Sequence, residues 1–238
     1  VAYEELVSDE SAALYHRGFA WFKLLRHWTS MRWDDTQGLR PSCLERRARG
    51  VYGILERTKT SGPGKHLTVL PVFVSSAAWI RSPWLDAGLA LWLDPDLGLA
   101  FKRDFFLPLP SPDFGAALKM RACYSDALGF SRALLGALPA SDGSALLPPP
   151  APLFWSEHSD RSGLDGWCAA LGVAATERSF LGRWAAKSST DSYVRTACRV
   201  VENLQRLACG FARRSLGGGP DFFGEEHVLA DLRRFMLD

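Results

Sequence analysis

Apolar residues recur at helical spacing over several stretches of the chain. Between residues 10 and 31 they include Leu14, Phe19, Phe22 and Leu25, which predicts a helix that ends near Arg32. The helices that this spacing predicts cover residues 10–31, 83–93, 123–138, 158–172, 176–185, 192–213 and 222–237. The pattern therefore predicts a mainly α-helical protein.

The period of the pattern changes between residues 43 and 74. Residues 51–60 and 66–74 are rich in β-branched and aromatic side chains, and a Ser-Gly-Pro-Gly turn at 61–64 separates them. This arrangement predicts an antiparallel hairpin, alone or within a three-stranded sheet. Prolines mark residues 94–113 as irregular and 139–152 as a Pro-rich loop. No internal repeat divides the chain, so we expect a single domain over residues 1–238.

Composition indicates a globular protein with a substantial core, but it does not indicate a function. With 47% apolar and 12% aromatic residues, a chain of 238 residues can bury a substantial core. Without a run of about 18 apolar residues, no transmembrane helix is expected. Five scattered cysteines with no CxxC pair favour reduced thiols, an intracellular location and no zinc site. The net charge of +2 is small for a DNA-binding protein, although the arginines are clustered.

Four residues near the C-terminus form a set suited to phosphodiester chemistry. His158 and Arg161 lie one helical turn apart, and Trp184 and Tyr193 follow them. Arginine grips phosphate oxygens through a planar fork and keeps its charge. An indole N–H is a further donor, and a phenol is a nucleophile once charge on the phosphoryl group is stabilised. Each residue taken alone has an ordinary structural explanation; their order and spacing make the set informative.

The order and spacing of these four residues resemble the tyrosine recombinase, or phage integrase, family, with Trp at the third position. The family also requires a hairpin lysine and an earlier arginine. The Arg-Thr-Lys-Thr sequence from Arg57 to residue 60 resembles the lysine motif, so Lys59 is the expected general acid, with Lys65 as its rival. Arg32, followed by Asp35, resembles the first arginine motif.

The resemblance implies a fold, a reaction and partners. The fold is the integrase catalytic core, and the reaction is DNA cleavage and rejoining through a 3′-phosphotyrosine on Tyr193, without metal or other cofactor. Arg32 and Arg161 would clamp the phosphate, and Asp35 would orient its neighbours. His158 would be the acid–base or hydrogen-bond partner, and Trp184 would donate its indole N–H or buttress the site. The partners would be double-stranded DNA and further copies of the chain in a synaptic tetramer.

The resemblance also implies where the protein acts and how far the chain extends. We expect recombination or integration of a mobile element, in the nucleus of a eukaryote or with cytoplasmic DNA otherwise. The helical domain that precedes the catalytic core in the family is missing, so the chain looks like the catalytic domain alone or a truncated copy. Asp160 departs from the family by placing an acid next to the phosphate site.

Other interpretations remain open at the level of the sequence. The same fold can act as a catalytically inactive DNA-binding module, or as a type IB topoisomerase-like enzyme, and an unrelated helical interaction protein is a further alternative. Arg195 and Arg199 lie off the apolar stripe of the Tyr193 helix, together with Arg206 and Arg213. They are expected to contact the DNA backbone or to form a solvated cationic face. Arg57 and Lys65 of the hairpin are also expected to bind DNA.

Overall fold

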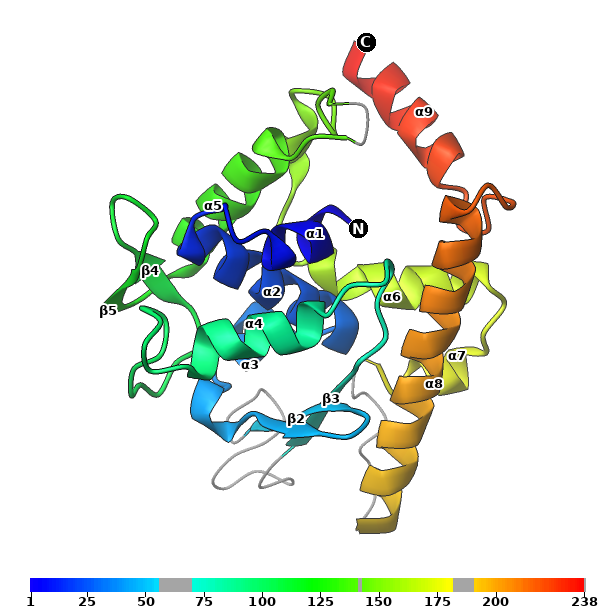
Figure 1. Cartoon of the computed structure of the whole chain (residues 1–238). Coiled ribbons are helices and arrows are strands. Elements are labelled where there is room, and N and C mark those ends of the chain that lie inside the picture. The colour runs from blue at the N-terminus through cyan, green and yellow to red at the C-terminus, as the bar shows by residue number, and fades with distance from the viewer. Residues whose placement is uncertain (56–69, 141–142, 182–190, 238) are drawn as a thin grey trace.

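The computed structural model describes residues 1–55, 70–140, 143–181 and 191–237, with the side chains of the long helix α8 described from Cys198 onward (Figure 1). Its helices are α1 (Ala2–Ser8), α2 (Leu14–Thr29), α3 (Trp33–Gln37), α4 (Trp84–Leu93), α5 (Tyr124–Ala137), α6 (Ser159–Ala170), α7 (Ala175–Arg178), α8 (Asp191–Leu216) and α9 (Glu225–Leu237). Short 3-10 turns cover Pro41–Cys43 and Ala151–Phe154.

Two small antiparallel sheets accompany these helices. The first has the order β1 (Glu45–Arg47), β2 (Gly50–Leu55), β3 (Leu70–Ser75). Its register places Val51 opposite Val74 and Leu55 opposite Leu70. The second sheet pairs β4 (Pro108–Pro110) with β5 (Ala117–Arg121) and contains an irregularity in its register. A mainly helical chain with a small three-stranded sheet is therefore confirmed as the coarse fold class.

Most predicted elements are present. The helix predicted over 176–185 is wrong in extent, because α7 ends at Arg178 and residues 179–181 form a turn. Helices α1 and α3 and the β4–β5 hairpin were not predicted. The tip of the first hairpin, which carries the predicted turn, lies outside the described residues.

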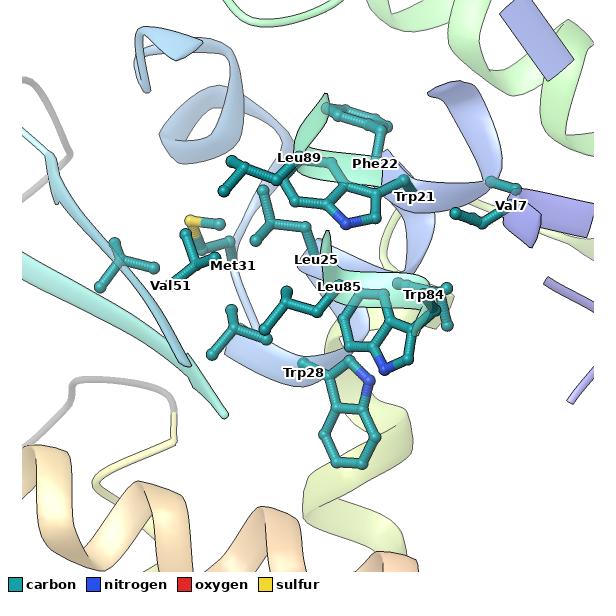
Figure 2. Close-up of a cluster of buried hydrophobic side chains, with 14 of the residues drawn as sticks. Val7, Trp21, Phe22, Leu25, Trp28, Met31, Val51, Trp84, Leu85 and Leu89 are labelled. Carbon is teal, nitrogen blue, oxygen red and sulfur yellow. The ribbon is translucent and has the colours of Figure 1, made fainter. Parts of the chain in front are cut away.

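Helix α2 is surrounded by other elements and is buried on nearly every side. Trp21, Leu25 and Trp28 are each at most 1% exposed, and they pack with Trp84 and Leu85 of α4 (Figure 2). Burying aromatic side chains of this size is a dominant source of stability in a core. Helix α2 is thus the element around which the domain is assembled.

A network of buried charges joins α2 to the start of α6. Lys23 Nζ lies 3.2 Å from Glu157 Oε1 and 2.6 Å from Asp160 Oδ2, and Arg26 pairs with both acids. The Ser131 hydroxyl of α5 donates to Glu157 at 2.6 Å and accepts from Lys23 at 2.9 Å. All four charged side chains are at most 4% exposed. The two cations and two acids balance, so no net charge is buried.

The acids of this network respond differently to burial. Burial alone would raise the pKa of Glu157, but Lys23 and Arg26 hold that pKa below its ordinary value. For Asp160, burial prevails over the same two cations and raises the pKa. Glu157 is therefore the carboxylate that the network stabilises most strongly in its charged form.

A buried glutamine fixes α8 against the rest of the domain. Gln205 is fully buried, and its carbonyl accepts from the Ser75 N–H of β3 at 2.8 Å. Its amide donates to the Trp28 carbonyl at the end of α2, also at 2.8 Å. Helix α8 runs along one side of the domain, shown in orange in Figure 1, and carries Tyr193 in its first turn. The long helix is thus anchored well beyond the position of Tyr193.

Replacing Lys23 with Met tests the charge network. The variant leaves two buried acids facing Arg26 alone, and breaking a buried ion pair on one side typically costs about 3–5 kcal/mol. We expect a loss of that size in the free energy of unfolding, measured by urea denaturation. Glu45→Ala is the control: its partner Arg47 is exposed, so the midpoint should stay unchanged. Equal midpoints for both variants would contradict this account.

Candidate phosphate-binding site

Arg32 is held between two anchored residues at the junction of α2 and α3. Helix α2 ends at Ser30, which has a left-handed backbone with φ of 50°. Met31 is fully buried, and Trp33 is 8% exposed and packs edge-on against Phe22. Arg32 is the N-cap residue of α3 and is partly exposed. The turn therefore projects one arginine from an otherwise buried segment.

His158 and Arg161 occupy the first turn of α6. The Arg161 N–H donates to the His158 carbonyl at 3.0 Å, and His158 is exposed while Arg161 is partly buried. The expectation that Asp160 lies next to the phosphate site is wrong. Its side chain is 3% exposed and points inward to Lys23 and Arg26, because the first turn of α6 places it on the core side of the helix.

The residues from these two junctions meet at one open pocket with a volume of about 580 Å³. Its lining residues are Arg32, Trp33, Asp34, Arg121, Ala122, Cys123, Tyr124 and His158. Arg32 and His158 are far apart in sequence and belong to α3 and α6, so only the fold brings them together. Such a pocket, with two arginines and an imidazole, suits an anion.

Arg161 does not line this pocket, but it lies within electrostatic range of Arg32, which does. Partial burial lowers the pKa of the Arg161 guanidinium, the nearby charge of Arg32 lowers it further, and Asp35 acts in the opposite direction. Two guanidinium groups near enough to repel each other are stabilised by an anion that lies between them. Asp35 is an acid near Arg161 that partly offsets this repulsion, and the orienting role expected for it stays a prediction.

The remaining predicted residues are not placed by the structure. Lys59, Lys65, Arg57 and Trp184 lie outside the described residues. Tyr193 and Arg195 belong to the first turns of α8, where side chains are not described. Whether they reach the pocket stays a prediction.

Three of the arginines on α8 that were expected to contact DNA have described side chains. Arg199 is exposed and lines a second open pocket of about 490 Å³ with Arg47 and Cys43. Arg206 instead pairs with Glu202 at 2.9 Å, and Arg213 donates to the Ala78 carbonyl at 2.8 Å. Arg206 is therefore engaged within α8 itself, while the bond from Arg213 links α8 to the segment after β3.

Two pocket residues were not predicted from the sequence. Arg121 ends β5, and Tyr124 begins α5 with its hydroxyl 3.3 Å from the Glu157 N–H that donates to it. The alternation of Leu118, Lys119, Met120 and Arg121 was a detectable strand signal, but it is short. The position of Tyr124 depends on a long-range contact that periodicity does not reveal.

A buried side-chain amide connects α3 to the β4–β5 hairpin. Gln37 at the end of α3 is 1% exposed. Its carbonyl accepts from the Leu107 N–H at 2.9 Å, and its amide donates to the Ala122 carbonyl at 2.9 Å. Because Ala122 adjoins Arg121, this contact fixes Arg121 relative to Arg32, which begins the same short helix.

Gln37→Leu should loosen this connection. The variant leaves the Leu107 N–H and the Ala122 carbonyl without their buried side-chain partner, at a cost of about 1–3 kcal/mol for each unsatisfied group. We expect the Leu107 amide to exchange hydrogen faster, measured by hydrogen–deuterium exchange. The Val72 amide of the first sheet serves as an internal reference and should keep its protection. Unchanged exchange at Leu107 would contradict a connecting role for Gln37.

Comparisons with known proteins do not supply a function. No protein-family model matches the chain, and searches of curated proteins and of solved structures gave no match. Within the part of the chain that the structure describes, no helix is long and apolar enough to cross a membrane. The same residues contain no group of three His, Cys, Asp or Glu side chains placed to hold a metal ion. A function for this chain is therefore inferred from the pocket and from the residues that line it.

Proposed function

We propose that this chain is a DNA breaking and rejoining domain of the tyrosine recombinase type, with Tyr193 as its nucleophile. The observation that supports the proposal is that Arg32, before α3, and His158, before α6, line one pocket, while Arg161 lies in the turn that follows His158 and within electrostatic range of Arg32. Two ordinary surface residues so far apart in sequence have no particular reason to meet at one pocket. Residues that share a phosphate do.

The proposed reaction is an in-line displacement at a DNA phosphorus atom. The Tyr193 oxygen forms a bond to phosphorus, and the bond from phosphorus to the 5′-oxygen breaks. The tyrosine proton leaves, with His158 as the acceptor or hydrogen-bond partner, and Lys59 gives a proton to the departing 5′-oxygen, with Lys65 as the alternative acid. Reversal of these steps rejoins the strand, so the bond energy is kept in the phosphotyrosine and no nucleotide is consumed.

Arg32 and Arg161 would supply most of the stabilisation of the transition state. A free phenol has a pKa of about 10, so the reaction depends on neutralising charge that develops on the phosphoryl oxygens. Arg32 and Arg161 are partly buried, and an interaction with an anion is stronger there than in open water. The indole N–H of Trp184 would provide a further donor. The proposed biological role is recombination or integration of DNA within a synaptic assembly of several copies.

Covalent trapping on nicked suicide duplexes tests the proposal. Because the target sequence is not known, the probe is a pool of nicked duplexes with randomised sequence, and the product is a protein–DNA adduct resolved on a denaturing gel. We expect Tyr193→Phe to abolish the adduct and Arg161→Ala to slow its formation by about 10²–10³-fold. Tyr52→Phe, on β2 and outside the lining of the Arg32 pocket, should behave as the wild type.

Two outcomes would sink the proposal as stated. An adduct that survives Tyr193→Phe excludes Tyr193 as the nucleophile. Salt-dependent duplex binding with no adduct on any sequence, by a protein that is folded by circular dichroism, would favour the non-cleaving DNA-binding module. Relaxation of supercoiled plasmid without metal or ATP would instead indicate the topoisomerase-like activity.

A further inference from the structure

The β4–β5 hairpin presents an unusual exposed strand beside the candidate pocket. From Leu118 to Arg121 every residue of β5 is exposed, with Met120 at 59%. Side chains alternate along a strand, so Lys119 and Arg121 share one face and Leu118 and Met120 the other. Since Arg121 also lines the pocket with Arg32 and His158, the cationic face of the strand continues directly from that pocket.

The charge of this strand is not neutralised within the described part of the chain. Arg46, Arg47 and Arg49 each have an acidic partner, which lies on α4, on β1 and on α8 respectively. By contrast, no described acidic side chain forms an ion pair with Arg121 or Lys119. Exposed cations that the protein leaves unpaired beside an anion pocket can bind an anion without first giving up a partner.

The hairpin is also fixed in place, which distinguishes it from a mobile surface loop. Ala122 donates its N–H to the Leu107 carbonyl at 3.0 Å, and Gln37 bonds to both of these residues. A cation at the end of a pinned strand loses less conformational freedom on binding than one at a flexible tip. Arg121 is therefore positioned at a set place relative to Arg32.

We propose that Arg121, with Lys119 behind it, binds the DNA backbone phosphates that flank the phosphate held by Arg32 and Arg161. This inference rests on the proposed function and extends it by naming a DNA-contacting surface on β5. Arg121 offers a planar fork suited to a phosphate, and Lys119 supplies a point charge one pleat further along the strand. Contacts of this kind fix the register of the duplex on the protein and carry no base specificity.

The salt dependence of duplex binding tests the inference. The probe is a fluorescein-labelled 30-bp duplex, followed by anisotropy between about 50 and 200 mM NaCl, a range over which phosphate contacts change affinity strongly. Arg121→Ala should weaken binding several-fold and reduce the slope of log K against log salt by about 1, which is the loss of one phosphate contact. Lys119→Ala should have the same direction of effect.

Arg81→Ala is the matched control, because Arg81 is an exposed arginine in the loop before α4 and does not line the pocket. It should keep the wild-type affinity and slope. If Arg121→Ala behaves like Arg81→Ala while the wild type binds DNA and forms adducts, the inference is overturned and the proposed function stands. If Arg121→Ala reduces the slope of log K against log salt while neither the wild type nor any variant forms adducts, DNA binding by β5 is supported and DNA cleavage is not. A wild-type protein that fails to bind the duplex overturns both.

Discussion

Lys23 and Arg26 extend from the C-terminal half of α2 into the interior, where Glu157 and Asp160 neutralise them. The candidate pocket depends on this interaction. Glu157 directly precedes His158, which lines the pocket, and Asp160 directly precedes Arg161, which is partly buried in the same turn of α6. At the other end of the network, Arg26 lies in the last turns of the helix that leads to Arg32. One buried charge network thus sets both sides of the pocket.

Two buried amides extend this constraint to the rest of the domain. Gln37 ties α3 to the base of the β4–β5 hairpin, and Gln205 ties α8 to β3 and to the end of α2. Both connect segments far apart in sequence, and both satisfy backbone groups that would otherwise be buried without a partner. The result is a rigid frame in which the cations of the pocket are held close despite their mutual repulsion.

The sequence allowed local structure to be predicted better than long-range contacts. Amphipathic spacing located α2, α5, α6 and α8, and the Gly- and Pro-rich turn located the pairing of β2 with β3. The sequence motifs also singled out Arg32 and His158, which line one pocket in the fold. Long-range pairing was not predictable. Asp160 was expected next to the phosphate site, because the residues around it in sequence do not reveal that it pairs with Lys23 and Arg26 in the core. Arg121 and Tyr124 were missed for the same reason, since their place at the pocket depends on Gln37 and Glu157.

The identity of the nucleophile is the most direct test of the account, because a second tyrosine, Tyr124, lines the pocket. Trypsin separates the two candidates, since Tyr193 falls in the peptide of residues 188–195 and Tyr124 in that of 122–132. Mass spectrometry of a nuclease-trimmed, trypsin-digested adduct should find the deoxynucleotide phosphate on the peptide of residues 188–195. Finding it on the peptide of residues 122–132 would contradict the account and make Tyr124 the attacking residue.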